Sequence, residues 1–293
     1  MSTNGHFSPG RRATLFSLLG AMAAAACNGG GGDSGAPVPA PPGSIPARLT
    51  LSGAQMLTPD GQPIVLRGIN EGTWGKMRSD DATTIAAQGG KAVRVLIRWW
   101  GLYGGSPVES RVDTAPGHFD PDHLAQFLRE VQWCIDAGLW VIAAIDSNCG
   151  QNGLQDAGTA QYCDPAGAYP GGRNFWTDPT QRQLFKQAWV HLAGILKDYP
   201  QIACYEPLPE PLAGRDSSHG AEVSAFYQEL MTAIEDQAGD RRTPFLVGAR
   251  DAYNINLCDE AYIAAPRWAN RVVYTGNLFL RTNKSQQENI ANL

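Results

Sequence analysis

A glutamate held between two prolines is the residue of this sequence best suited to acid–base chemistry. It is Glu210, near the end of the stretch IACYEPLPEPL at Ile202–Leu212. The first residues suit a strand with both faces covered, and the prolines cannot donate to a strand ladder, so pairing ends near Glu210. Barrel enzymes place catalytic groups at such strand ends. The alternative is an ordinary solvated loop glutamate, and Glu206 is a weaker candidate because its side chain should point elsewhere.

Strand and helix patterns alternate along the chain on either side of this stretch. The strand patterns are Leu49–Leu51, Pro63–Ile69, Ala92–Trp100, Leu139–Asp146, Thr243–Gly248 and Val272–Phe279, and the helix patterns are 81–89, 120–138, 178–199 and 224–238. Such alternation predicts a parallel sheet with crossover helices, and its regular spacing favours a closed barrel over a doubly wound sheet. The turn Pro59-Asp60-Gly61 predicts a hairpin that joins the first two strands. No G-x-G-x-x-G loop follows the first strand, which disfavours dinucleotide binding.

The amino terminus is typical of an exported bacterial protein. Arg11 and Arg12 precede the apolar run Leu15–Ala26, which predicts a twin-arginine export signal. The sequence AAAC ending at Cys27 resembles a lipobox, in which Cys27 is acylated and anchors the mature chain to the membrane. A plain signal peptide cut near the alanines is the alternative.

The sequence therefore divides into a signal at 1–27, a Gly/Pro-rich flexible tether at 28–45 and a folded domain at 46–293. Asn28 after the cysteine favours the outer membrane, by resemblance to lipoprotein sorting rules. We expect a cell-envelope protein, lipid-anchored or secreted, and a monomer.

Composition and cysteine usage narrow the possible partners. Of 293 residues, 43% are hydrophobic and 17% charged, and the net charge of −5 disfavours nucleic acid as a partner. The histidines have no metal-ligand spacing, so neither a metal nor another cofactor is implied. Cys149 and Cys163 flank a polar segment and are the predicted disulfide, whereas Cys134 and Cys204 lie in apolar patterns and are predicted to be buried thiols.

Several stretches, in this order, resemble glycoside hydrolase family 5, the retaining β-glycanases of (β/α)8 fold that include many cellulases. They are LRGIN at Leu66–Asn70, VRVLIRW at Val93–Trp99, DAG at Asp136–Gly138, LWVIAAID at Leu139–Asp146, Glu210-Pro211 and VVYTGNLF at Val272–Phe279. The resemblance implies an α/β fold of TIM-barrel type and hydrolysis of β-linked polysaccharide. It implies that Glu210 is the general acid/base and that Arg94 orients and charges the nucleophile. Retaining enzymes hold the two carboxylates about 5–5.5 Å apart, and the acid must be protonated before the reaction.

The sequence departs from the family pattern at four positions. Pro209 replaces the asparagine before the acid/base, Asn148 stands where the third strand usually ends in histidine, and Asn277 and Phe279 replace histidine and tyrosine on the sixth strand. Each replacement keeps a polar or aromatic shape, except the proline. We expect the sugar to contact Arg94, Asn148 and Asn277 together with two loop tryptophans. These tryptophans are Trp74 and Trp176.

The resemblance places the nucleophilic glutamate on a seventh strand, and only Glu288 follows the sixth strand pattern. Nothing around Glu288 resembles a buried strand end, so it is a weak candidate and the expected barrel is incomplete at its C-terminus. A second hypothesis therefore stays open, namely a catalytically inactive surface lipoprotein that binds glycan or a partner on a glycosidase-like barrel.

Overall fold

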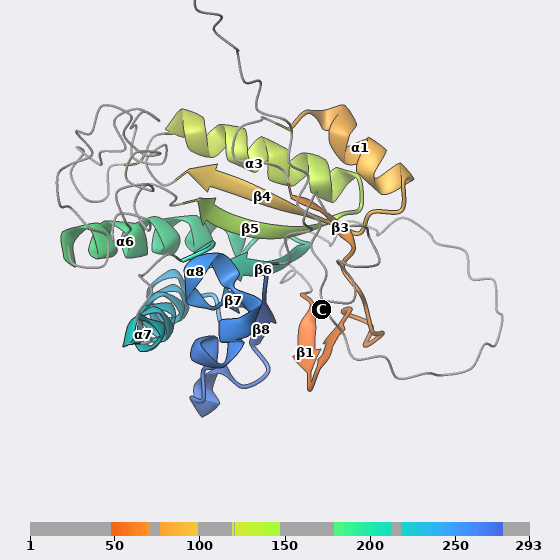
Figure 1. The fold of residues 1–293 in the computed structure, drawn as a ribbon. Coiled ribbons are helices and arrows are strands. Elements are labelled where there is room, and N and C mark those ends of the chain that lie inside the picture. The colour runs from red at the N-terminus through yellow and green to blue at the C-terminus, as the bar shows by residue number, and fades with distance from the viewer. Residues whose placement is uncertain are drawn as a thin grey trace, which may run out of the picture.

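The computed structural model describes residues 48–70, 77–98, 119, 121–146, 179–211 and 218–277, and its centre is a parallel sheet of six strands (Figure 1). The strands are β3 (Gly68–Asn70), β4 (Ala92–Arg98), β5 (Trp140–Asp146), β6 (Ile202–Glu206), β7 (Phe245–Gly248) and β8 (Val272–Thr275). They lie side by side in the order in which they occur in the chain. A doubly wound sheet reverses its order at a switch point, and this sheet does not. The fold is α/β with a parallel half-barrel sheet, as in part of a (β/α)8 barrel.

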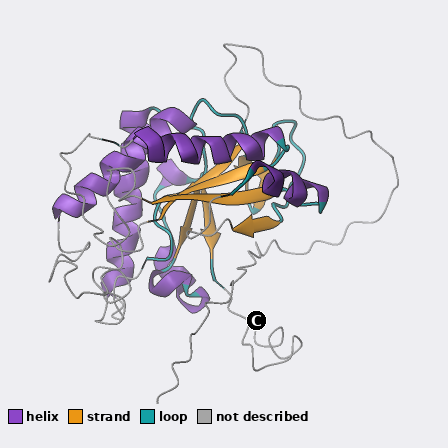
Figure 2. Cartoon of the chain, turned by 90° about the horizontal axis from the view of Figure 1, so that it is seen from above, coloured by secondary structure: helices purple, strands orange, loops and turns teal. Residues whose placement is uncertain are grey.

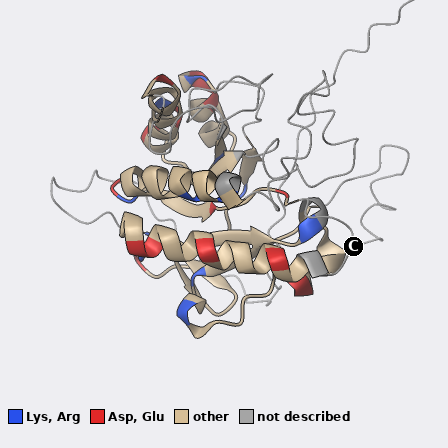
Figure 3. Ribbon diagram, turned by 90° about the vertical axis from the view of Figure 1, so that its left-hand side faces the viewer, with Lys and Arg blue, Asp and Glu red and all other residues tan. Residues whose placement is uncertain are grey.

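Helices follow the strands and cover one face of the sheet (Figures 1 and 2). They are α1 (Ser79–Ala87), α3 (Pro121–Asp136), α6 (Pro179–Leu196), α7 (Ser218–Ala233), the π-helical turn η2 (Ile234–Ala238), α8 (Arg250–Tyr253), and the 3-10 turns η3 (Ile255–Ala261) and η4 (Pro266–Trp268). Figure 3 shows charged positions spaced along the outer helices, while the strands behind them are mostly uncharged. None of the helices in the described part of the chain is long and apolar enough to span a bilayer.

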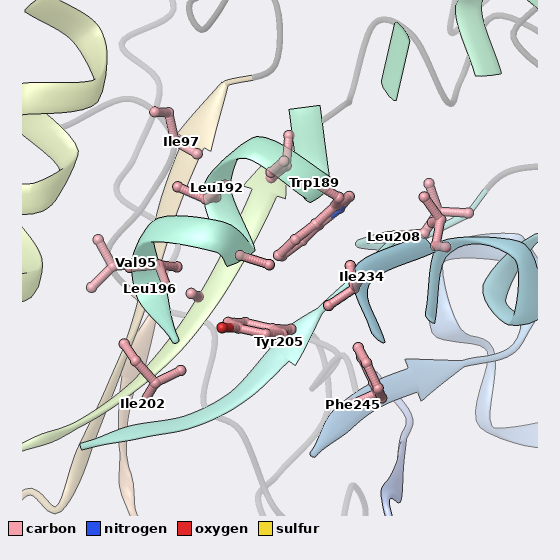
Figure 4. Close-up of a cluster of buried hydrophobic side chains, with 14 of the residues drawn as sticks. Val95, Ile97, Trp189, Leu192, Leu196, Ile202, Tyr205, Leu208, Ile234 and Phe245 are labelled. Carbon is pink, nitrogen blue, oxygen red and sulfur yellow. The ribbon is translucent and has the colours of Figure 1, made fainter. Parts of the chain in front are cut away.

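The main hydrophobic core lies between the helices and the sheet. Along β4, Val93, Val95 and Ile97 point into this core, as the two-residue period of a strand requires. From α6, the fully buried Trp189 faces Tyr205 of β6, with ring centroids 5.6 Å apart (Figure 4). The opposite side of each strand is thereby left to face the inside of the half-barrel.

A smaller cluster fills the amino-terminal end of this inner face. A hairpin of β1 (Thr50–Ser52) and β2 (Gln55–Leu57) lies here, and Met56 packs against the cluster. The cluster itself contains Leu49, Leu66, Ala92, Ile142, Ala203, Cys204 and Leu246. Apolar side chains thus occupy the amino end of the inner face, which leaves its carboxyl end for polar residues.

The predicted first hairpin was wrong. The chain turns at Gly53, which has a φ of +57°, and not first at Pro59-Asp60-Gly61. The latter turn exists, with the Gly61 amide 2.9 Å from the Thr58 carbonyl, but it supports only a single bridge between Leu57 and Pro63. The predicted strand Pro63–Ile69 is therefore reduced to β3, because its amino half returns to the hairpin instead of joining the sheet.

Asp240 is a buried carboxylate that ties the chain before β7 to β6. It accepts hydrogen bonds from the Tyr205 hydroxyl (2.8 Å), the Thr243 hydroxyl (2.6 Å) and the amides of Arg242 and Thr243 (2.9 and 3.1 Å). Burial by itself would raise the pKa of Asp240, but these hydrogen bonds outweigh it and lower the pKa below its ordinary value of 3.8.

We expect this arrangement to make stability depend on acid pH. A lowered pKa in the folded state stabilises the protein above the unfolded pKa, and this contribution is lost as the pH falls through the folded value. Asp240→Asn should therefore lower the free energy of unfolding by about 1–3 kcal/mol at pH 7. The difference from the wild type should shrink in strong acid. Denaturant unfolding of both proteins at pH 7 and in strong acid checks this. An equal difference in the free energy of unfolding under the two conditions would contradict it.

Candidate active site

The carboxyl end of β6 holds a buried ion pair between Glu206 and Arg94 of β4. The Arg94 Nη2 lies 2.8 Å from Glu206 Oε1, its Nε donates to Oε2, and its Nη1 lies 3.0 Å from Oδ1 of Asn70 at the end of β3. The Glu206 side chain is fully buried and that of Arg94 is 9% exposed. Burial alone would lower the pKa of Arg94, but the charge and hydrogen bonds of Glu206 raise it, so the guanidinium stays charged.

The segment after Glu206 leaves the sheet yet stays buried. Residues 207–209 are buried. The prolines interrupt the strand ladder here, so the carbonyls of this segment need hydrogen-bond donors from outside the sheet. Three aromatic side chains supply these donors. The Trp189 indole donates to the Pro207 carbonyl at 2.7 Å, and the hydroxyls of Tyr227 and Tyr253 lie 3.1 and 2.9 Å from the Leu208 carbonyl. The segment is therefore fixed by packing and hydrogen bonds although it is not part of a regular element.

Glu210 stands at the end of this fixed segment and is exposed. Its φ is +47°, in the left-handed region that a residue other than glycine seldom adopts. The side-chain amide of Asn277, just after β8, donates to Glu210 Oε1. Two predicted site residues that are 67 positions apart are thus brought together, and the strained backbone at Glu210 is a feature common at functional sites.

Tyr253 connects the two carboxylates of this site. Its hydroxyl lies 2.8 Å from Glu206 Oε1 and 2.9 Å from the Leu208 carbonyl. Its backbone carbonyl accepts a hydrogen bond from the backbone N–H of Asn277 at 2.8 Å. Burial raises the pKa of Tyr253, and the charge of Glu206 raises it further, so the hydroxyl keeps its proton and acts as a donor. Sequence reasoning had not identified Tyr253, because no local pattern distinguishes it from a core tyrosine.

The structure describes only some of the predicted site residues. Arg94 lies within β4, whereas Glu210 and Asn277 contact each other beyond the carboxyl ends of β6 and β8. Outside the described residues lie Trp74, Asn148, Trp176, Glu288, Cys27, Cys149 and Cys163. Cys134 and Cys204 are buried and carry no disulfide bond, which confirms the predicted buried thiols. Among the described residues, no cluster of histidine, cysteine or carboxylate side chains is arranged to hold a metal ion.

The chemistry available at this site follows from the contrast between its two glutamates. Glu206 is enclosed and paired with a permanent cation, so it serves to hold Arg94 in place. Glu210 is open to solvent, and its Oε1 accepts a hydrogen bond from the neutral side-chain amide of Asn277, so a bound molecule can reach its carboxyl group for proton exchange. The arrangement is suited to general acid–base chemistry on a ligand at the carboxyl ends of the strands.

Comparison with known proteins gives one family and several solved structures. The family model described as Cellulase (glycosyl hydrolase family 5) matches residues 57–289. No curated protein sequence matches the chain significantly.

The structural matches agree with the fold described above. The crystal structure of an endogalactoceramidase has a TM-score of 0.60 at 20% identity, covering 84% of this chain and 64% of that one. Thermotoga maritima Cel5A, in complex with mannotriose, has a TM-score of 0.51 at 17% identity, covering 71% and 58%. A mutant of PbGH5A from Prevotella bryantii B14, in complex with a xyloglucan tetradecasaccharide, has a TM-score of 0.50 at 17% identity, covering 73% and 57%. The chain therefore spans less than two thirds of each of these solved chains, and likeness at such identities establishes the fold alone.

Proposed function

Because the chain belongs to glycoside hydrolase family 5, we propose that it hydrolyses β-linked glycans with Glu210 as the general acid/base. The observation that carries the proposal is the placement of Glu210. It is an exposed carboxyl group on a buried, hydrogen-bonded segment at the carboxyl end of β6, where barrel enzymes carry out their chemistry. The solved relatives in complex with mannotriose and a xyloglucan oligosaccharide support an oligosaccharide as the ligand.

In the proposed retaining mechanism, Glu210 acts twice. It first gives its proton to the departing glycosidic oxygen while a second carboxylate attacks the anomeric carbon and forms a glycosyl-enzyme. Glu210 then takes a proton from the water that hydrolyses this intermediate, and the original state is restored. Glu288 is the weak candidate for the second carboxylate, and Trp74, Trp176 and Asn148 are proposed sugar contacts; all four lie outside the described residues.

A second candidate function is glycan binding without hydrolysis. The contacts of Arg94 favour it, since the carboxylate held by this arginine is Glu206. A fully buried carboxylate has no access to an anomeric carbon. In this alternative the strand ends bind sugar while Arg94 and Glu206 serve only the fold.

Reducing-sugar release from a panel of polysaccharides and one glycolipid distinguishes the two functions. The panel contains β-glucan, xyloglucan, mannan, xylan and, because an endogalactoceramidase is among the similar structures, a galactosylceramide. We expect turnover of at least one substrate and its loss in Glu210→Gln. Saturable binding by calorimetry without turnover, in a protein shown to be folded, would favour the second function, and turnover unchanged in the variant would exclude the role of Glu210.

We further propose that the protein is exported and anchored to the cell envelope through an acylated Cys27. A thioether-linked lipid with several acyl chains holds a protein firmly at a bilayer surface. In a bacterial host, the wild type should fractionate with membranes and incorporate labelled palmitate, and Cys27→Ser should lose both properties. Cys258→Ser, which changes a cysteine of the folded domain, is the matched control and should keep both. Labelling that persists in Cys27→Ser would contradict the anchor.

A further inference from the structure

The segment that carries Glu210 and the residue that contacts Glu210 are both held by one residue, Tyr253, through its hydroxyl and its backbone carbonyl. The Tyr253 hydroxyl reaches the Leu208 carbonyl, two residues before Glu210, at 2.9 Å. The Tyr253 carbonyl accepts from the amide of Asn277 at 2.8 Å, and the Asn277 side chain donates to Glu210. Tyr253 thus contacts two separate parts of the chain that determine where the Glu210 carboxyl group lies.

Tyr253 has a strained backbone conformation and a tightly packed ring. Its φ is +60°, in the left-handed region, although it is a bulky residue that is only 1% exposed. Its ring also lies where a side chain on Gly248 would stand, since a Cβ there would be 2.3 Å from Tyr253 Cδ1. Strained backbone of this kind persists where the surrounding contacts determine it, and it is concentrated at functional sites.

We propose that Tyr253 is a positioning residue for Glu210, an assignment that rests on the proposed glycosidase function. Its hydroxyl joins the Leu208 carbonyl, which Tyr227 also contacts, to the buried Glu206, and its backbone carbonyl holds Asn277 beside Glu210. The single hydroxyl hydrogen of Tyr253 is shared between Glu206 Oε1 and the Leu208 carbonyl. One group therefore links the ion pair of Glu206 with Arg94 to the segment that carries Glu210.

The proposal predicts a specific kinetic effect of Tyr253→Phe. This change keeps the ring and removes the hydroxyl, so the segment loses its link to Glu206 and Glu210 moves relative to the substrate. A displacement of about 1 Å can cost up to about 100-fold in rate. We therefore expect kcat on a natural glycan to fall about 10–100-fold, with KM changed less than about twofold, because substrate contacts remain.

Tyr205→Phe is the matched control. It removes the hydroxyl of another buried tyrosine, which bonds Asp240 instead of the Glu210 segment. Its kcat should stay within about twofold of the wild type, even though its melting temperature should fall because Asp240 loses a hydrogen-bond partner. An equal fall of kcat in both variants would show that Tyr253 acts only through stability, and would overturn the proposal.

A crystal structure of Tyr253→Phe separates this proposal from the proposed function. We expect the segment Leu208–Pro211 to shift and the contact between Asn277 and Glu210 to open. Gly248→Ala, which pushes the same ring aside, should produce a similar shift. An unmoved Glu210 in both variants would overturn the positioning role whether or not the protein turns over glycans. A wild type without any turnover would instead reject the proposed function, and the two crystal structures would still decide the role of Tyr253.

Discussion

Glu206→Gln is expected to lower the free energy of unfolding by about 3–5 kcal/mol, the range found when one partner of a buried ion pair is removed. The side chain keeps its shape but loses its charge, and the buried Arg94 loses the anion that contacts its guanidinium directly. Glutamine also presents an amide hydrogen to one of the guanidinium nitrogens in place of an oxygen acceptor. Chemical denaturation with a constant m-value measures the effect.

The pair between Arg250 and Glu260 provides the control for this prediction. It has the same type of contact, with Nε–Oε2 at 2.6 Å and Nη2–Oε1 at 3.0 Å, but its glutamate is 22% exposed. Water can reach that site, so Glu260→Gln should cost clearly less than Glu206→Gln. Equal costs for the two changes would contradict our view that enclosure makes the Arg94 pair critical. An Arg94→Met, Glu206→Gln double variant should be less destabilised than the sum of its single changes, since no unpaired charge remains.

Glu210→Gln is expected to lower kcat on natural glycans by about 10²–10⁴-fold, the usual contribution of a general acid or base. Glutamine keeps the size of the side chain and its contact with Asn277, but it cannot release a proton to the leaving oxygen. Because Glu210 is exposed, the free energy of unfolding should change by no more than about 0.5 kcal/mol. Steady-state kinetics together with a melting curve therefore separates loss of chemistry from loss of fold.

Glu229→Gln is the comparison variant for Glu210. Glu229 is an exposed glutamate of α7 with a 3.7 Å surface ion pair to Lys186. Its replacement should leave both kcat and stability nearly unchanged. If Glu210→Gln behaved in the same way as Glu229→Gln, Glu210 would be a loop glutamate without a catalytic role.

The central strands of the sheet were predictable from sequence because they are buried on both faces, unlike the edge strands β3 and β8. The apolar runs that predicted Ala92–Trp100, Leu139–Asp146 and the Glu210 stretch correspond to β4, β5 and β6, with boundaries that differ by a few residues. Helix boundaries were similarly recognisable from an initial proline and a final glycine, as in α3, which begins at Pro121 and is followed by Gly138 in the left-handed region.

The site was only half predictable, because its remaining contacts depend on the tertiary structure. Glu210 could be found at a strand end and Arg94 through the family resemblance, but the partner of Arg94 could not, since 112 positions separate it from Glu206. Glu206 was ranked below Glu210 as a catalytic candidate, and its burial agrees with that order. The hydroxyl of Tyr253 reaches Leu208 only because the chain turns sharply at a positive φ, and a tyrosine at such a φ has no sequence signature.

The leaving-group dependence of Glu210→Gln tests the central claim most directly. A general acid is needed when the departing alcohol is a poor leaving group, and it is not needed when the departing phenol is strongly acidic. We predict that the variant loses about 10²–10⁴-fold in kcat/KM on an unactivated oligosaccharide but less than about tenfold on the dinitrophenyl glycoside of the same sugar. An equal loss on both substrates would contradict the assignment of Glu210 as the general acid.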